Sequence, residues 1–257
     1  MPAKVNIISI EKAQKLIDQE RDVLLIDVRQ PEEYEKGHIP GALLIPLPEL
    51  PDRLAELKTD KNIFTYCRLG RRSLAAAQLI ADEYDAEVFT IDGGIMAWNG
   101  LVAKGNIEEG LRLFEGLKGP EEFVTLAYCL EEGSKEFYLR VQEFFREEIF
   151  RILASVEETH KKRIADAWPG IKTDQMFTDR MEGGLMISKV MERIISGNMG
   201  FQEILEYSMQ IEINSLDLYK RITGLVDPSI ADIFRGIISE EKAHLKRLGE
   251  LIAHQNI

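Results

Sequence analysis

The hydrophobic positions of this chain follow two different periods, and the period changes near residue 100. In the first part, short apolar runs alternate with amphipathic stretches, a pattern that predicts a mainly parallel sheet covered by helices. The expected strands are 23–28, 42–45, 62–66 and 87–91, and the expected helices are 10–19, 49–57 and 73–84. Residues 1–105 are therefore predicted to form an α/β domain.

The second part keeps a period of about 3.6 residues, which indicates amphipathic helices. Four long stretches are expected, at 120–144, 145–165, 200–223 and 229–254, with a crossover at 171–199 that has helical character in 184–196. Two antiparallel helix pairs joined by a long connection are the plan of a four-helix bundle. Residues 120–257 are thus predicted to be an all-α bundle, and the glycine-rich stretch 106–119 to be a linker.

The composition limits which binding partners and which cellular location are expected for this protein. The 257 residues carry a net charge of −12, which disfavours nucleic acid and anionic membranes as partners. Cys67 and Cys129 are the only cysteines, so we expect no disulfide framework and a cytoplasmic location. No apolar run approaches the ~20 residues that span a bilayer, and the N-terminus lacks the pattern of a signal peptide.

The clearest chemical signal is the segment from Cys67 to Arg72, between an expected strand and an expected helix. A thiol in that position meets converging backbone N–H groups and the positive end of a helix dipole. Three arginines within five residues add positive field, so the thiolate should be favoured over the thiol. A lone cysteine is ordinarily a small buried hydrophobe, but the glycine and the arginines favour a reactive thiolate at Cys67.

Cys67, Gly70 and Arg72 match the C-x-x-G-x-R active loop of the rhodanese family, which the chain resembles over roughly residues 5–105. The other matching segments are Asp27-Val28-Arg29, Glu33-Tyr34, the turn from Gly37 to Ala42, and Gly93-Gly94 with Trp98. The resemblance implies transfer of sulfane sulfur from thiosulfate or a persulfide, through a transient Cys67 persulfide, to a thiol or cyanide. It also implies that the donor is bound by Arg68, Leu69, Gly70, Arg71 and Arg72.

Loop length separates this chain from the related tyrosine-phosphatase loop, which needs an arginine six residues after the cysteine. That position is Ser73, and Arg72 closes a shorter ring that suits a single sulfur atom. His38 lies in the turn motif and is expected to be structural rather than a general base. Asp27 and Arg29 are expected to hold the loop through hydrogen bonds.

A second constellation is repeated within the helical part. Glu131 and Glu212 each precede a tyrosine, Tyr138 or Tyr219, by seven residues, and Glu-x-x-His occurs at Glu157–His160 and at Glu241–His244. On a helix, positions i and i+3 share a face, so each Glu-x-x-His points both side chains in one direction. One Glu from each of two helices plus Glu-x-x-His from the other two is a di-iron ligand set. Carboxylates with two imidazoles suit iron or manganese.

Residues 118–254 resemble the rubrerythrin and ferritin-like superfamily in spacing and ligand type. The resemblance implies a di-iron centre, with manganese as the other possible metal, held by Glu131, Glu157, His160, Glu212, Glu241 and His244 and flanked by Tyr138 and Tyr219. Glu158 and Glu240 are adjacent alternatives, Glu132 is a substitute for Glu131, and Cys129 is expected in the core. Rubrerythrins often carry a further carboxylate where this chain has Ser215, and they carry a four-cysteine iron site that is absent here.

Three functions are compatible with these features. The first is a sulfurtransferase coupled to a di-iron redox bundle. The second is a di-iron peroxidase or oxygen-responsive protein in which the rhodanese-like domain serves as reductant, sensor or docking module. The third is an iron-binding protein for storage or trafficking. A redox-active bundle would need an external electron donor, and the bundle could form a homodimer.

Overall fold

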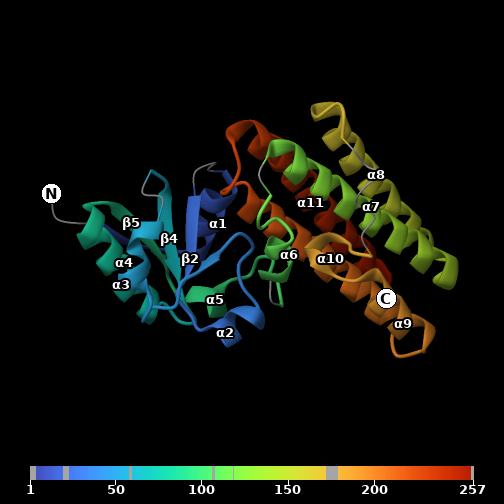
Figure 1. The fold of residues 1–257 in the computed structure, drawn as a ribbon. Coiled ribbons are helices and arrows are strands. Elements are labelled where there is room, and N and C mark those ends of the chain that lie inside the picture. The colour runs from blue at the N-terminus through green and yellow to red at the C-terminus, as the bar shows by residue number, and fades with distance from the viewer. Residues whose placement is uncertain are drawn as a thin grey trace. The chain divides into compact units, whose positions relative to one another are not determined.

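The computed structural model describes residues 4–19, 23–57, 60–105, 108–117, 119–171 and 179–255. The chain divides into two compact units, Met1–Gly105 and Asn106–Ile257 (Figure 1). This division falls at the predicted end of the α/β domain. Each unit is described by itself.

The first unit is built on a five-stranded sheet in which every pair of neighbouring strands is parallel. The strands are β1 (Lys4–Ile8), β2 (Val23–Asp27), β3 (Leu43–Leu44), β4 (Asn62–Tyr66) and β5 (Glu87–Ile91), in the order β1-β5-β4-β2-β3. The four predicted strands are present. The edge strand β1 was not expected, because Asn6 interrupts its short apolar run and its pairing partner β5 lies about 80 residues away.

Helices cover both faces of this sheet. They are α1 (Ile10–Gln19), α2 (Pro31–Glu35), α3 (Leu50–Arg53) with η1 (Leu54–Glu56), α4 (Arg71–Tyr84) and α5 (Gly94–Ala97). One apolar cluster joins the sheet to α3 and α4 through residues such as Leu50 and Ile80. The other joins it to α1, α2 and α5 through residues such as Ala13 and Tyr34, with Ile95 packed against it. The result is the helix–sheet–helix layering that the alternation of strands and helices predicts.

The strand order places a switch point of the chain between β4 and β2. The chain leaves β4 toward β5 on one side, and it leaves β2 toward β3 on the other side. In open parallel sheets, ligands bind at such a switch point, outside the carboxyl ends of the strands. Asp27 and Tyr66 pair in register at the ends of β2 and β4, so the loops that follow these two strands meet there.

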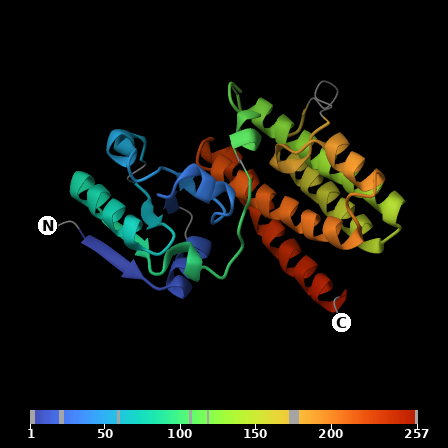
Figure 2. The ribbon, with the colours of Figure 1, turned by 90° about the horizontal axis from the view of Figure 1, so that it is seen from below.

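The second unit is helical. Its elements are α6 (Glu108–Arg112), α7 (Pro120–Phe145), α8 (Glu148–Ala167), η3 (Glu182–Gly184), α9 (Ile187–Ile195), α10 (Phe201–Ile222) and α11 (Pro228–Gln255). Proline fits the first helical position because its missing N–H has no partner there, which explains why α7 and α11 begin at Pro120 and Pro228. The four long helices agree with the predicted stretches to within three residues at each end. Figure 2 shows these helices in the colours that run from green to red.

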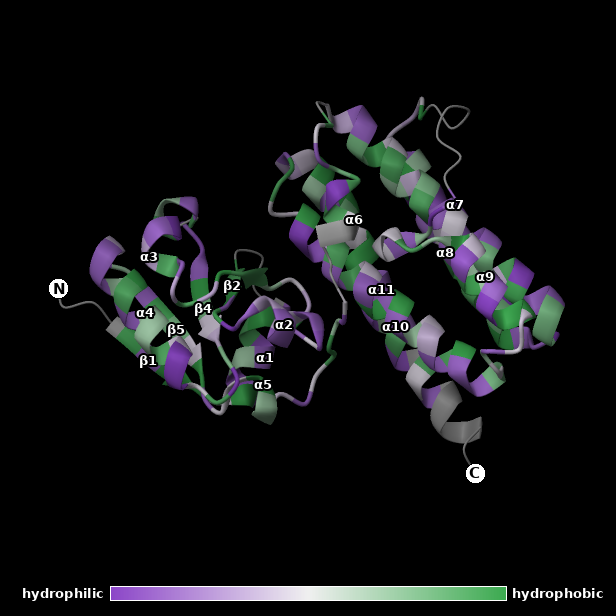
Figure 3. Ribbon diagram, turned by 60° about the horizontal axis from the view of Figure 1, so that its bottom comes forward, coloured by the Kyte–Doolittle hydropathy of each residue, from purple (hydrophilic) through white to green (hydrophobic). Residues whose placement is uncertain are grey.

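These helices pack as pairs, α7 against α8 and α10 against α11, with α11 also against α8. Hydrophobic and hydrophilic residues alternate along the long helices (Figure 3), as expected where one side of each helix is buried. The buried apolar residues form two clusters. One contains Phe137, Phe150 and Leu205, and the other contains Leu130, Ile164 and Phe234.

The stretch expected as a linker is not simply a connection. Within it, α6 packs against η3 and α10. Phe114, which follows α6, is buried in the second apolar cluster. The glycines indicated a linker, but its leucines and Phe114 supply enough apolar surface to dock on the helices. Among the described residues, no helix is both long and apolar enough to cross a membrane.

Candidate active site and candidate metal centre

Cys67 lies directly after β4, in the turn that leads into α4, and its side chain is buried. Gly70 caps the helix with φ of +91°, a left-handed conformation that glycine adopts at little cost. This turn aims the Gly70 N–H at the sulfur, with 3.1 Å between the nitrogen and Sγ. The thiol therefore sits at a helix N-terminus, at the switch point of the strand order.

The pKa of the Cys67 thiol is lowered by its surroundings. Burial acts in the opposite direction and raises the pKa, but hydrogen bonds from the Ser73 N–H and hydroxyl and from the Leu69 and Gly70 backbone outweigh it. The sequence pattern predicted a favoured thiolate from converging backbone N–H groups, the helix dipole and the arginines. Hydrogen bonds are the leading stabilisation, and Ser73 was considered only as the place where a phosphatase arginine is missing.

Removing the Ser73 hydroxyl should shift the pH dependence of any reaction at Cys67. A hydrogen bond to a charged group is worth roughly 1.5–3 kcal/mol, and about 1.4 kcal/mol corresponds to one pH unit. Because the Ser73 side chain favours the thiolate and its hydroxyl also donates to the Gly70 carbonyl at 3.1 Å, Ser73→Ala should move the rising limb of the pH profile upward by about one pH unit. The ultraviolet absorbance of the thiolate, followed against pH, measures this directly. The exposed Gln78→Ala on the same helix is the control, and identical profiles for both variants would contradict the assignment.

Arg72 is engaged by an acidic side chain. Its two terminal nitrogens lie 2.7 and 2.8 Å from the two carboxylate oxygens of Glu33 on α2. The hydrogen bond from Arg72 is the main reason that the pKa of Glu33 falls to about 2. This bidentate ion pair holds the Arg72 guanidinium beside the loop, where its charge also interacts with Cys67. Arg68, Leu69 and Arg71, by contrast, are exposed on the loop.

The loop rests on the N-terminus of α5. The carbonyl oxygens of Cys67 and Arg68 accept hydrogen bonds from the N–H groups of Ile95 and Met96, at 2.8 and 3.2 Å. Gly94 makes this approach possible, because a Cβ there would lie 2.2 Å from the Cys67 carbonyl oxygen. The carbonyls are thus turned away toward α5, and the N–H groups of the loop are left for the sulfur.

Gly94→Ala should therefore disturb both the loop and the stability of the first unit. The added Cβ must displace the Cys67 carbonyl, and the left-handed φ of +56° is strained for alanine. We expect the free energy of unfolding to fall by about 2 kcal/mol or more, measured by chemical denaturation. Gly105→Ala is the matched control, since Gly105 also has a positive φ, but a Cβ added there would meet nothing within 4 Å. Equal losses in both variants would mean that only backbone strain matters.

The predicted supporting residues form a buried network below the loop. Asp27 accepts hydrogen bonds from the Arg29 side chain at 2.6–3.0 Å, and Arg29 donates to the Gly37 carbonyl at 2.7 Å. His38 is buried, stacks on Tyr34 with ring centroids 3.7 Å apart, and places Nδ1 2.9 Å from the Tyr34 carbonyl. These contacts fix the turn around Gly37, and these hydrogen bonds of Asp27 and Arg29 go to each other and to this turn rather than to the Cys67 loop.

In the second unit, a layer of buried carboxylates separates the two apolar clusters. Along α7, Glu131 follows Leu130 of one cluster and precedes Phe137 of the other, and Glu157, Glu212 and Glu241 hold the equivalent place on α8, α10 and α11. The side chains of all four are fully buried. The repeated spacing in the sequence therefore reflects one polar layer across the helices.

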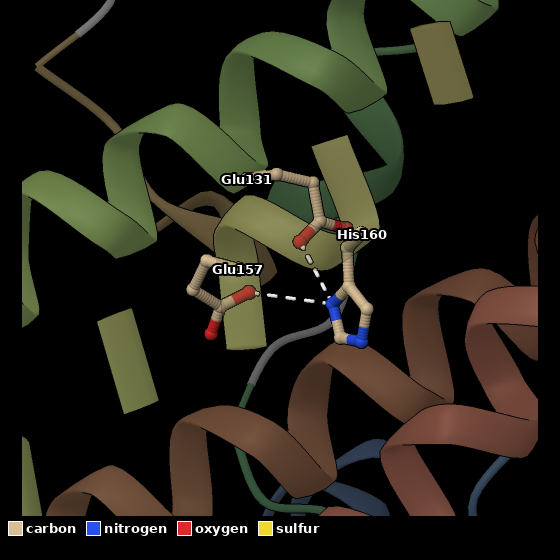
Figure 4. A group of neighbouring side chains, drawn as sticks. All are labelled: Glu131, Glu157 and His160. Carbon is tan, nitrogen blue, oxygen red and sulfur yellow. Dashed lines mark hydrogen bonds and ion pairs between the residues drawn. The ribbon is translucent and has the colours of Figure 1, made fainter. Parts of the chain in front are cut away.

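Four of the six predicted ligands, Glu131, Glu157, His160 and Glu241, come together in this layer, and Figure 4 shows the first three. His160 places Nδ1 3.1 Å from Glu131 Oε2 and 3.4 Å from oxygens of both Glu157 and Glu241. Glu131, Glu157 and His160 form one group whose ligand atoms lie within 4.8 Å of one another. The other ring nitrogen of His160 faces Glu240 at 3.8 Å, the side on which metal-binding histidines commonly meet a carboxylate.

The other two predicted ligands lie at the edge of these groups. Glu212 on α10 accepts a hydrogen bond from Tyr138 on α7, and Glu131 on α7 accepts one from Tyr219 on α10 at 2.5 Å. The two hydrogen bonds therefore cross between α7 and α10. The His244 ring lies 5.3 Å from the His160 ring, between centroids, and is half-buried. Neither Glu212 nor His244 belongs to the groups of ligand atoms that already lie within 4.8 Å.

Sequence reasoning missed one member of the layer. Glu182 is fully buried, and it forms a second group of ligand atoms with Glu157 and Glu241. It belongs to η3, in the crossover between the helix pairs, and it has no histidine three residues later. No helical period marks it, so spacing alone could not select it.

Of the alternatives considered for the ligands, Glu132, Glu158 and Cys129 lie outside the layer, whereas Glu240 faces His160 from its edge and pairs with Arg163. Glu158 pairs with Lys135 at 2.6 Å and with Lys161 at 3.1 Å, and Glu132 also pairs with Lys161. Cys129 is buried, and burial together with the nearby Glu132 raises the pKa of its thiol. These groups are satisfied by surface ion pairs or by packing, as expected for residues that are not ligands.

The layer has an excess of negative groups. Burial, followed by repulsion from the other carboxylates, raises the pKa of Glu157, Glu182 and Glu241. Burial lowers the pKa of His160, but attraction to the carboxylates outweighs it and raises the pKa to about 10. Within the described chain, no N–H or O–H donates a hydrogen bond to either carboxylate oxygen of Glu157 or Glu241. Such oxygens need a cation or a proton, so the residues present fit a metal site.

Comparison with known proteins places the first unit in a family. The sequence model of the rhodanese-like domain matches residues 9–101. A sulfurtransferase of Allochromatium vinosum is 41% identical over 95 residues, which cover 37% of this chain and 88% of that protein. The thiosulfate sulfurtransferase GlpE of Pseudoalteromonas translucida is 34% identical over 91 residues, which cover 35% of this chain and 86% of that protein. A solved rhodanese-related protein of Thermoplasma volcanium is 27% identical with a TM-score of 0.35, covering 38% of this chain and 97% of that one. Through residues 9–101, the chain belongs to the rhodanese family.

Proposed function

We propose that the first unit is a sulfurtransferase that carries sulfane sulfur as a persulfide on Cys67. The observation that carries this proposal is the hydrogen bonding of the sulfur, since the Gly70 N–H points at Sγ and the surrounding donors lower the pKa of the thiol. The same donors can stabilise the negative charge of a persulfide. Similarity to sulfurtransferases, among them a thiosulfate sulfurtransferase, supports the same reaction class.

The reaction has two balanced steps. The Cys67 thiolate attacks the outer sulfur of thiosulfate, the S–S bond of the donor breaks, and sulfite leaves with the electron pair while the persulfide forms. Cyanide or a thiolate then attacks the outer sulfur of the persulfide, which returns Cys67 as a thiolate. Each step is a displacement at sulfur, favoured by a stabilised leaving group, and no external oxidant or reductant is consumed.

The exposed residues of the loop suit the approach of an anionic donor. Arg68 and Arg71 can attract the donor from solvent, while Arg72, held by Glu33, contributes a fixed charge beside Cys67. Mass spectrometry of the protein after treatment with thiosulfate tests the proposal. The peptide that contains Cys67 should gain one sulfur atom, and cyanide should remove it.

The buried carboxylate layer favours a second function in the same chain. We propose that Glu131, Glu157, His160, Glu212, Glu241 and His244 hold a pair of iron or manganese ions in a ferritin-like bundle. Support comes from the repeated Glu and Glu-x-x-His spacing and from the buried Glu157 and Glu241, whose oxygens receive no hydrogen bond within the described residues. Bound iron would supply redox chemistry with oxygen or peroxide, for which the electrons must come from an external donor.

Coupling between sulfur transfer and the metal bundle is the proposed function of the whole chain. Metal analysis of the purified protein tests whether the centre exists, and its optical spectrum with and without peroxide separates a redox enzyme from an iron store. A change in that spectrum when Cys67 is converted to the persulfide would support coupling. If the spectrum changes neither with peroxide nor with the persulfide, iron binding is left as the function of the bundle.

A further inference from the structure

The proposed metal centre contains one carboxylate that lies outside the repeated helical pattern. Glu182 belongs to η3, in the connection between α8 and α9, and its side chain is fully buried. It offers an oxygen within 4.8 Å of ligand atoms on Glu157 and Glu241. A role for Glu182 as a ligand rests on the proposed metal function of the second unit.

Two serines hold this carboxylate in place. The hydroxyl of Ser134 lies 3.2 Å from Glu182 Oε2 and accepts the Glu182 N–H at 3.2 Å, while the hydroxyl of Ser215 donates to Oε1. Ser134 follows Glu131 by three residues on α7, and Ser215 follows Glu212 by three residues on α10. These two helices, α7 and α10, therefore each present a hydroxyl to Glu182 one turn after their own glutamate and on the same face.

The backbone around Glu182 is shaped to bring it against α7. A Cβ at Gly133 on α7 would lie 2.0 Å from the carbonyl oxygen of Arg180, so glycine is needed for the connection to pass at this distance. Gly183 and Gly184 turn the chain directly after Glu182 with φ of +71° and +76°. The connection thus approaches α7 closely at Arg180 and turns tightly at Gly183 and Gly184, with Glu182 between these two points.

The hydrogen bonding leaves Glu182 able to bind a cation. Each of its oxygens accepts one serine hydroxyl, and a carboxylate oxygen has two acceptor positions, so one position on each oxygen is left. Glu157 and Glu241 face it with oxygens that receive no hydrogen bond within the described chain. For a purely structural role, glutamine would serve better, because its amide could donate to these facing carboxylates. Three facing carboxylates are instead a ligand set for a hard divalent cation.

We propose that Glu182 is a metal ligand, supplied by the connection rather than by a helix, and that it binds the ion on the Glu157 and Glu241 side of the centre. Ser134 and Ser215 act as positioning residues, since they touch Glu182 and leave its remaining acceptor positions toward the centre. The ligand set of this bundle is then larger than the repeated helical pattern implies.

Metal titration of the full-length protein with Mn(II) alone, with and without the isosteric substitution Glu182→Gln, tests the assignment. The unmodified chain should bind two ions, and the variant should lose one of them or bind it at least about tenfold more weakly. Glu158→Gln is the matched control, because Glu158 lies on the exposed side of α8 and pairs with lysines. Two ions bound with unchanged affinity by Glu182→Gln would overturn the assignment. An unmodified chain that binds no metal would overturn the metal function as well.

The melting temperature of the metal-free proteins separates a ligand from a structural residue. Since glutamine removes one of several facing carboxylates, the metal-free Glu182→Gln protein should melt at the same temperature as the unmodified protein or higher. Only the increase in melting temperature caused by the metal should shrink. A metal-free variant that melts lower or fails to fold would assign Glu182 a structural role and contradict the proposal.

Discussion

Replacing Cys67 with serine should reduce the formation of thiocyanate from thiosulfate and cyanide to the uncatalysed background. Serine keeps the size of the side chain and its place in the loop, but a hydroxyl cannot carry sulfane sulfur as a persulfide. The loss should therefore appear in kcat rather than in the stability of the domain. Thiocyanate assays and thermal melting of the same preparations measure the two effects separately.

Cys129→Ser is the control for this experiment. Cys129 lies on α7 of the second unit, and its thiol has a raised pKa because of burial and the neighbouring Glu132. We expect this variant to retain sulfur transfer and to take up the added sulfur at Cys67 as the unmodified protein does. Full activity in Cys67→Ser, or equal losses in both variants, would show that the persulfide is formed elsewhere.

Removal of metal should lower the melting temperature of the helical unit by several degrees or more. A ligand that binds only the folded state at a concentration 1,000 times its dissociation constant stabilises it by about 4 kcal/mol. In the metal-free protein, the buried carboxylates must instead be protonated or repel one another. Calorimetry of the chelated and the iron-reconstituted protein measures the shift, and the transition of the first unit in the same scan should be unaffected.

Two substitutions sharpen the metal experiment. His160→Ala removes the group that faces three carboxylates, so it should lower both the metal content and the metal-dependent increase in melting temperature. Glu158→Ala should change neither, since that carboxylate is exposed and paired with lysines. The metal assignment is wrong if iron-replete protein contains no transition metal and its melting temperature does not respond to added iron.

The sequence allowed most secondary structure to be predicted, because hydrophobic periods depend on local spacing. The buried strand β4 and the helix α7 were both marked by their own apolar patterns. The edge strand β1 was not, because only its pairing with the distant β5 makes it a strand. The docking of α6 and Phe114 was missed for the same reason, since it depends on surface that other helices provide.

The residues of the two candidate sites also divide into those that a sequence pattern marks and those that only the fold brings into place. Cys67 could be found from a short contiguous loop, and His160 from its spacing to Glu157. Ser73 contributes through the hydrogen bonds that it brings to the sulfur at the start of α4, and Glu182 through a connection that crosses the helices. Both depend on where the folded backbone places a side chain, which neither period nor motif encodes.

The crossed hydrogen bonds of the two tyrosines have a consequence for how the helical unit folds. Tyr138 on α7 reaches Glu212 on α10, and Tyr219 on α10 reaches Glu131 on α7, while Glu182 is held by a serine from each of these helices. A hairpin of α7 and α8 alone would bury its carboxylates without these donors, and so would a hairpin of α10 and α11. Neither half can complete its polar layer by itself, so the two hairpins should assemble cooperatively, in one all-or-none transition.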